Sequence, residues 1–298
     1  MANSITGIND DIIAQGAIEA FTASVLPLTS MVTNFSADAA KRGEKVSILR
    51  TIAADAATTK VSHTAYTIQD ADSDAIELTL GQPVYVSFGL DDVEIASSSV
   101  LNMDVYGKQK GFQLAKKVLQ DVLSEITAAN FGAAGFTGAA ANFDEDDVAD
   151  IASQMDQADI PEDGRVLVLK PAYFTSLLKS TGIKDASAFG GAEAIRQGNI
   201  PNLSGFAIFK SNLIPANGEN LVGFASHMTS LAFAMRYLQP QEGNTYLRAE
   251  PFTDPNGSGV TLGLRDWYEN STGIRNRVFE CVYAWETAQD GIQRLVSA

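Results

Sequence analysis

The strongest hydrophobic pattern in the chain lies between Met103 and Phe131. Polar and charged side chains alternate there with an apolar stripe at helical spacing: Val105, Phe112, Ala115, Leu119, Val122, Ile126 and Ala129. The pattern predicts one amphipathic helix that spans roughly 40 Å at about 1.5 Å per residue. A seven-residue spacing also suits a coiled coil, but the frequent alanines favour a single long core helix.

The first 90 residues predict a helix followed by two strands. A short amphipathic helix is expected over Asp11–Val25, ended by Pro27. Alternating apolar residues over Lys45–Ile52 and Ala75–Phe88 predict two strands, joined by the polar and small residues of Ala53–Asp74. Because one helix and an isolated hairpin are both marginal in water, we expect each of them to need another surface.

The remainder of the chain predicts a compact α/β unit and then mainly strands. In residues 143–225 we expect a helix after Asp144–Asp147, a strand over Arg165–Leu169, a helix over Pro171–Ser180 and a strand over Phe206–Lys210. In residues 226–298 the expected strands are Thr229–Tyr237, Val260–Glu269, Arg275–Thr287 and Gly291–Val296.

Composition narrows the classes of function. The 298 residues are 45% hydrophobic and 19% charged, as in a globular protein, and the net charge is −15. A nucleic-acid-binding protein usually carries a basic face, so the negative net charge of this chain disfavours that class. One cysteine and two histidines exclude an internal disulfide framework, a cysteine zinc site and an iron–sulfur cluster. There is neither a secretory signal pattern nor a membrane-spanning apolar run, so we expect synthesis in a reducing cytosol.

Most of the sequence motifs that mark catalytic, nucleotide-binding or metal-binding sites are absent. The nucleophile elbow, the phosphate loop and the dinucleotide fingerprint are absent. The acids of Asp70–Asp74 begin like a calcium loop, but Ala75 and Gly81 stand where that loop needs glycine and glutamate. Asp144–Asp147 suit a helix N-terminus better than a metal site. We interpret Cys281 as a core residue and His227 as a half-buried residue at the start of a strand.

The order of these segments resembles the major capsid proteins of tailed bacteriophages, the Hong Kong 97-type shell fold. The resemblance is strongest in Pro161–Leu178, with its P-x-x-G-R-hydrophobic-P-x-x-Y-x-x-L-L run. It continues in Ile200–Ile208 and in Ser211–Pro215, which are similar to the run I-x-G-F-x-I-x-x-S-x-x-(I/L)-P.

The resemblance implies an α+β fold in five parts. These are an N-terminal arm (1–44), an extended E-loop hairpin (45–90), a P-domain with the spine helix (91–142), an A-domain (143–225), and the A-domain return with P-domain strands (226–298). It further implies glycine-rich joints at 132–138 and 182–198 that allow domain rotation as a procapsid matures.

The function implied is that of a structural protein, not an enzyme, and it needs no cofactor. Self-assembly as pentamers and hexamers would give an icosahedral phage head that encloses double-stranded DNA. The implied partners are further copies of the chain, a scaffolding protein, a portal and, as a further candidate, a decoration protein, with no membrane. The chain would be made in the host cytoplasm and located in the virion.

Seven residues are candidates for assembly contacts. They lie in the hairpin and in the A-domain loop near 184–198: Lys60, Tyr66, Asp70, Asp72, Asp74, Lys184 and Arg196. Some family members crosslink a hairpin lysine to a neighbouring subunit, but we interpret Lys60 as a solvated tip lysine. Two alternatives stay open. One is an encapsulin-like nanocompartment shell that encloses protein cargo, and the other is a metal-assisted hydrolase using Asp144, Glu145, Asp146 and Asp147.

Overall fold

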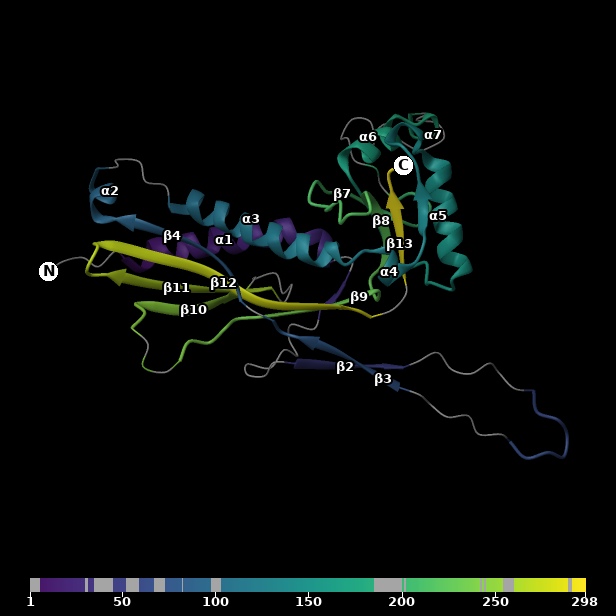
Figure 1. Ribbon diagram of the computed structural model, residues 1–298, viewed down its shortest axis with the longest axis horizontal. Coiled ribbons are helices and arrows are strands. Elements are labelled where there is room, and N and C mark those ends of the chain that lie inside the picture. Colours follow the sequence, from purple (N-terminus) through teal and green to yellow (C-terminus); the bar gives the residue numbers. More distant parts are fainter. Residues whose placement is uncertain are drawn as a thin grey trace.

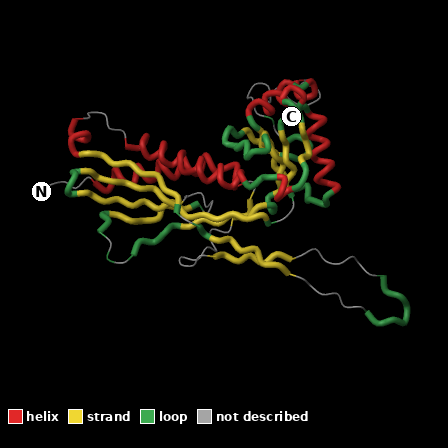
Figure 2. Tube along the Cα trace, in the orientation of Figure 1, coloured by secondary structure: helices red, strands yellow, loops and turns green. Residues whose placement is uncertain are grey.

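The computed structural model describes residues 6–29, 32–34, 45–51, 59–66, 73–81, 83–97, 103–184, 200, 202–241, 243, 245–253, 260–288 and 291–298. These residues form an elongated first body, a smaller second body at one end of it, and a hairpin that projects away from both (Figure 1). The C-terminus lies in the second body (Figure 2).

The first body is a sheet with two long helices along one face. Its strands follow the order β1-β9-β12-β11-β10, and β4 pairs with β12 off this path. Its elements are α1 (Thr6–Thr29), β1 (Val32–Asn34), β4 (Val84–Asp91), α2 (Asp92–Ser97), α3 (Met103–Ser124), β9 (Leu231–Arg236), β10 (Arg248–Thr253), β11 (Thr261–Glu269) and β12 (Ile274–Thr287). Strand β12 is long enough to pair with β4 and β11 along one half and with β9 along the other.

Two glycines allow α1 and α3 to pack closely. A Cβ at Gly107 would lie 2.3 Å from the carbonyl oxygen of Ile13, and one at Gly111 would lie 2.1 Å from that of Ala17. The helices then share one apolar core with the sheet, which includes Leu114 and Phe279. The hydroxyl of Tyr283 on β12 also donates to Asp121 Oδ2 of α3 at 2.6 Å.

The second body is a sheet of order β5-β13-β8-β6-β7 with helices packed against it. Its elements are α4 (Ala128–Phe131), β5 (Ala134–Thr137), η1 (Ala140–Asn142), α5 (Glu145–Gln157), β6 (Arg165–Leu169), α6 (Pro171–Lys179), α7 (Thr181–Lys184), β7 (Ala207–Lys210), β8 (Leu221–His227) and β13 (Ile292–Val296). A separate apolar core, which includes Phe143, Leu177 and Phe206, joins the sheet to α5 and α6. The predicted helices and the strand over Arg165–Leu169 are therefore confirmed.

The second apolar run, predicted as one strand over Ala75–Phe88, is two strands, so that prediction was wrong. β3 (Ser73–Thr79) pairs with β2 (Lys45–Thr51), whereas β4 pairs with β12. Pro83 precedes β4, and proline has no N–H to continue a ladder. The apolar side chains of β4 pack on the core that the sheet shares with α1 and α3, whereas Leu78 of β3 packs with Val282 and Ala284 in a separate cluster.

Both predicted helix ends in the N-terminal half were also wrong. α1 continues two residues beyond Pro27, because a proline near the end of a helix removes only one backbone donor. The helix predicted to reach Phe131 is interrupted after Ser124. Val105 and Phe112 are 46% and 43% exposed and Ala129 is exposed too, so the predicted stripe is buried only from Ala115 to Ile126.

The structure also tests the predictions for Cys281, for His227 and for the last four strands. Cys281 is fully buried, as predicted, and burial raises the pKa of its thiol. His227 is buried at the end of β8 rather than half-buried at a strand start, and its Nδ1 lies 2.8 Å from Thr229 Oγ1. The last four predicted strands are confirmed as β9, β11, β12 and β13, but β1, β5, β8 and β10 were not predicted. In the described residues, no helix combines the length and apolarity needed to cross a membrane.

Candidate assembly surfaces

The projecting hairpin has an anchored base and an exposed tip. At the base, Val46, Leu78 and Leu80 pack on Val282 and Ala284 of the first sheet. These two residues alternate along β12 with Phe279, Cys281 and Tyr283, which belong to the core shared with α1 and α3. Because neighbouring residues of a strand point to opposite faces, the hairpin base and the two helices lie on opposite faces of the sheet.

The tip of the hairpin carries side chains that suit a contact surface. Residues 59–66 are all exposed and lie well away from both bodies (Figure 1). Lys60 Nζ lies 3.7 Å from the ring centroid of Tyr66, which is 76% exposed, and Val61 is 66% exposed. An exposed cation–aromatic pair next to a solvent-exposed valine offers both charge and apolar area to another molecule.

The other candidate residues are placed as follows. Asp74 is exposed in β3, and its Oδ1 accepts from the N–H of Ala75 at 2.8 Å. Lys184 is the last residue of α7, and its side chain lies outside the described part of the structure. Asp70, Asp72 and Arg196 also lie outside the described residues. The structure therefore brings Lys60 and Tyr66 together and leaves the grouping of the others as a prediction.

A cluster of polar side chains joins the two bodies, and the sequence did not reveal it. Arg294 of β13 is 4% exposed, forms an ion pair with Glu219, and donates from Nη1 to the carbonyl of Gly132 at 2.8 Å. Glu219 accepts from the N–H of Ala128 at 2.9 Å, and Asn217 Nδ2 donates to the carbonyl of Ile126 at 2.6 Å. We call Asn217, Glu219 and Arg294 the joint cluster.

The joint cluster explains why the long helix is interrupted. In a continuous α-helix the carbonyl of Ile126 and the N–H of Ala128 would form backbone hydrogen bonds. Here both groups are hydrogen-bonded instead to side chains from the loop before β8. That loop needs left-handed backbone at Asn217, Gly218 and Asn220, with φ of 42°, 78° and 56°. Asparagine and glycine tolerate this region best, so the Asn-Gly-Glu-Asn sequence was the available signal.

Buried ion pairs stiffen the first sheet away from this joint. Asp266 is fully buried, and both of its carboxylate oxygens lie 3.0 Å from Arg275 Nε. Arg265 Nε lies 2.6 Å from Glu280 Oε1 on the other face, and Arg265 Nη2 donates to the carbonyl of Leu238 at 3.2 Å. Ion pairs with this little exposure depend on both partners, because removing one would leave a buried charge.

The acidic run Asp144–Asp147 caps a helix. Asp144 accepts from the N–H groups of Asp146 and Asp147 at 3.1 and 3.4 Å, and Asp147 accepts from the N–H of Asp144 at 3.1 Å, which forms a capping box. Burial raises the pKa of Asp147. Within the described residues, no group of histidine, cysteine or acidic side chains could hold a metal ion.

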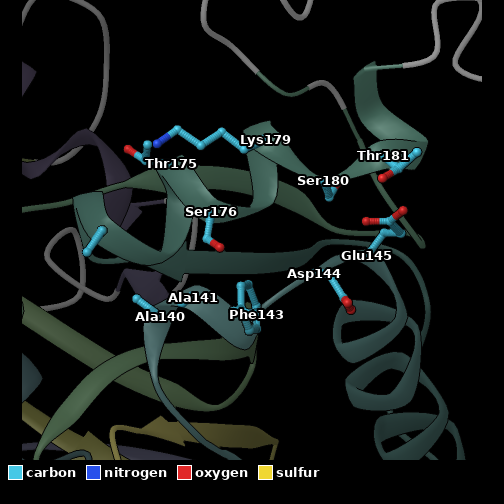
Figure 3. A pocket seen from close by; sticks show the side chains of 11 residues that line it. Ala140, Ala141, Phe143, Asp144, Glu145, Thr175, Ser176, Lys179, Ser180 and Thr181 are labelled. Atoms are coloured by element: carbon cyan, nitrogen blue, oxygen red, sulfur yellow. The ribbon is translucent and has the colours of Figure 1, made fainter.

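A pocket of about 560 Å³ lies beside this cap, between α5 and α6 (Figure 3). Its wall is formed mainly by small and hydroxyl-bearing side chains together with Lys179 and Glu145. Glu145 Oε1 accepts from the N–H of Gly182 at 2.8 Å, so this carboxylate fixes the start of α7.

Comparisons with known proteins give one family model and a set of similar solved structures. A family model described as "Phage capsid protein" matches residues 106–280. A search of curated proteins finds no match. Among solved structures, one titled "Mycobacterium phage Che8" has a TM-score of 0.63 at 19% identity, covering 89% of this chain and 88% of that one.

Two further structures show the same likeness. "Capsid structure of the Cyanophage P-SCSP1u" has a TM-score of 0.62 at 16% identity, with 90% of this chain and 86% of that chain covered. "Asymmetric unit of bacteriophage PhiM1 mature capsid" has a TM-score of 0.63 at 14% identity, with 90% and 85% covered. At these identities the likeness establishes the fold alone, and it confirms the predicted Hong Kong 97-type fold class.

Proposed function

Given that the chain belongs to the phage capsid protein family, we propose that many copies of it close into an icosahedral head of pentamers and hexamers that encloses double-stranded DNA. The chain is a major capsid protein with a structural role in the phage head, and it is not an enzyme. The metal-assisted hydrolase considered from the sequence is therefore set aside.

The observation that carries the proposal is the hairpin. Its base is anchored by buried residues such as Leu78, while every described tip residue from 59 to 66 is exposed. An arm of this shape buries little surface within its own chain but can bury its tip on a neighbouring copy. A closed shell repeats such contacts over all its subunits, so modest contacts sum to a stable particle.

The parts of the chain take the following roles in this proposal. The β2–β3 hairpin is the E-loop, the first body is the P-domain with α3 as its spine helix, and the second body is the A-domain. Lys60, Tyr66 and Asp74 act in contacts between subunits through the hairpin, and the segment from Lys184 to Gly198 acts around the axes of pentamers and hexamers. A scaffolding protein, a portal and a decoration protein are the expected helpers.

Shortening the hairpin tests the proposal. Thr51 and Ser73 are the last paired residues of β2 and β3, so an Asn-Gly turn in place of residues 52–72 would close the hairpin while keeping its base. We expect a chain with unchanged melting temperature that no longer forms closed particles, as seen by light scattering and negative-stain microscopy.

The matched control keeps the hairpin length and changes only its tip. In the K60A/Y66A variant the cation–aromatic pair is lost, and we expect particles that form in lower yield and dissociate at lower denaturant concentration. Normal particles from the shortened chain would contradict the assigned role of the hairpin. Failure of the shortened chain to fold would show up as a changed melting temperature and would move the test to the K60A/Y66A variant.

A further inference from the structure

The two bodies share one two-stranded antiparallel ribbon. On one strand β8 is followed directly by β9, and on the other strand β12 is followed by β13 (Figure 1). In the first body Leu231 lies opposite Thr287, and in the second body Ser226 lies opposite Ile292. Four residues separate these two pairs on each strand, so the register is the same on both sides. We call the part of the ribbon between the two pairs the ribbon corner.

The described residues of the ribbon corner are hydrogen-bonded and closely packed. The N–H of Ala288 donates to the carbonyl of Ser230 at 2.9 Å, and the N–H of His227 donates to the carbonyl of Gly291 at 3.2 Å. The side chains of Ser230 and His227 are buried. A Cβ at Gly291 would lie 2.4 Å from Ser230 Oγ, so the two strands are in close contact here. The corner therefore lacks the exposed backbone and loose packing that are typical of a mobile segment.

An apolar core also extends from the first body into the second. It contains Leu123 of α3 and Phe233 of β9 together with Val168 of β6 and Phe224 of β8. Side chains along β6 alternate between two cores, since Val168 belongs to this one and Leu167 belongs to the core shared with α5 and α6. One face of the second sheet is therefore packed on the first body. Domains move relative to one another by default, but a large apolar interface opposes such motion.

The glycine-rich segment 132–138, expected from the sequence to be a flexible joint, is part of the second sheet. Most of it is β5, which pairs with β13. The N–H of Gly138 donates to the carbonyl of Val296 at 3.2 Å, and Arg294 of the joint cluster donates to the carbonyl of Gly132. Backbone that is paired in this way is restrained from serving as an axis of rotation.

We propose that the two bodies form one folding unit and one rigid unit, held at a fixed angle by the ribbon corner, the shared core and the joint cluster. The base of the hairpin packs on the same ribbon through Val282 and Ala284, and its tip projects away. Copies of the chain therefore adapt to different places in a shell through the hairpin, and not by rotating one body against the other. This consequence rests on the proposed function, whereas the single unit itself does not.

The alternative is a hinge between the two bodies. A rotation large enough to matter would have to separate Val168 and Phe224 from Leu123, break the ion pair of Arg294 with Glu219, and distort the ribbon corner at the same time. Three connections of different kinds would thus have to fail together. A hinge usually needs only a few loop residues that change their backbone angles.

Chemical denaturation followed by two signals tests the folding unit. The two tryptophans of the chain, Trp267 and Trp285, lie in β11 and β12, so their fluorescence reports on the first body. Circular dichroism reports on the helices of both bodies. L177A truncates a fully buried side chain in the separate core of the second body. Because one cooperative unit unfolds in one transition, we expect L177A to lower the midpoints of both signals equally.

The control for this experiment is D150A, which changes an exposed residue of α5 and should leave both midpoints unchanged. A fluorescence midpoint that stays constant in L177A while the dichroism changes in two steps would overturn the inference. If L177A does not fold, native fluorescence of its tryptophans would overturn the inference in the same way. Loss of both signals in that variant would support a single unit.

Distances between spin labels test the fixed angle. Q113C/D150C places the labels at exposed positions of α3 and α5, whereas Q113C/E269C and D150C/E162C keep both labels within one body as controls. Cys281 is fully buried, so we expect it to stay unlabelled. We expect a distance distribution across the bodies that is as narrow as those of the controls. It should be the same in the unassembled chain and in particles where labelled chain is diluted with unlabelled chain.

The ribbon corner offers a matched pair of variants. In G291A the added Cβ would lie 2.4 Å from Ser230 Oγ, and in S230A/G291A the nearest remaining atom of residue 230 would be its Cβ, at 3.5 Å. We expect G291A to lower both midpoints and to broaden the distribution across the bodies, and S230A/G291A to regain most of both losses. An unchanged G291A chain would contradict the assigned role of the corner.

The distances also separate this inference from the shell function. A broad distribution across the bodies in the native chain, or one that changes when particles form, would overturn the single rigid unit and leave the shell function intact. A narrow distribution in a chain that never forms particles would support the single unit and count against the shell function.

Discussion

Replacing Gly111 with alanine is expected to destabilise the chain by about 2 kcal/mol or more, although alanine is the better helix former by about 1 kcal/mol. The added Cβ would lie 2.1 Å from the carbonyl oxygen of Ala17 and 2.9 Å from its Cα. These are backbone atoms of α1, so the clash is relieved only if the whole helix moves. Chemical denaturation monitored by circular dichroism measures the loss.

The double variant gives this prediction a sharper form. A Cβ at Gly107 would meet the backbone of Ile13 one turn earlier in the same seam. Because a single shift of α1 relieves both clashes, the G107A/G111A variant should lose less stability than the sum of the two single variants. Q113A is the control on the exposed side of α3, and it should change the stability by no more than about 0.5 kcal/mol. A stabilised G111A chain would show that α1 does not pack at this seam.

Replacing Glu219 with alanine is expected to cost about 2–3 kcal/mol and to loosen the joint between the two bodies. The change leaves the Arg294 guanidinium, which is 4% exposed, without its carboxylate, and it removes the acceptor for the Ala128 N–H. Breaking a buried ion pair costs about 3–5 kcal/mol, and Glu219 is 33% exposed, which reduces the loss. Chemical denaturation gives the total, and hydrogen exchange over 126–132 gives the local effect.

A double-mutant cycle separates the ion pair from simple truncation. R294M keeps the length of the side chain without its charge, so E219A/R294M no longer holds a stranded guanidinium. We expect this double variant to be more stable than E219A alone, with a coupling of about 1–3 kcal/mol. Additive losses would mean that Glu219 and Arg294 act independently and that the joint cluster does not hold the two bodies together.

The sequence was informative where the contacts that form a segment are close in the chain, or where the segment is buried along its whole length. Asp144–Asp147 begin a helix through their own backbone contacts, and Pro171 opens the next one. The strand over Arg165–Leu169 is buried on both faces, so a continuous apolar run sufficed to predict it. The capsid fold itself followed from the order of such segments and from the local runs of the second body.

The sequence was uninformative where distant residues decide the outcome. Ile126 fits the helical pattern of the sequence. In the structure Asn217, far along the chain, donates to the carbonyl of Ile126, and the helix does not continue. β4 continues the apolar alternation of β3, and only its pairing with β12 removes it from the hairpin. β10 contains Pro251 and charged residues, which are unusual in a strand and are acceptable here because it ends the sheet path.

The candidate assembly residues divide in the same way. Lys60 and Tyr66 could be chosen because the polar connection between two strands must project, and the structure places them in contact. Arg294 and Glu219 could not be chosen, since their partnership depends on how β13 meets the loop before β8. Val105 and Phe112 were predicted as core residues, and their exposure appears only once α1 occupies the other side of α3.

The most direct test of the shell function is the size of the purified protein in solution. Size-exclusion chromatography with light scattering and negative-stain microscopy, with and without a candidate scaffolding protein, would measure it. The account predicts rings, curved sheets or closed shells of many copies, with uniform closed shells when the scaffold is present. A protein that stays monomeric under both conditions would contradict the account.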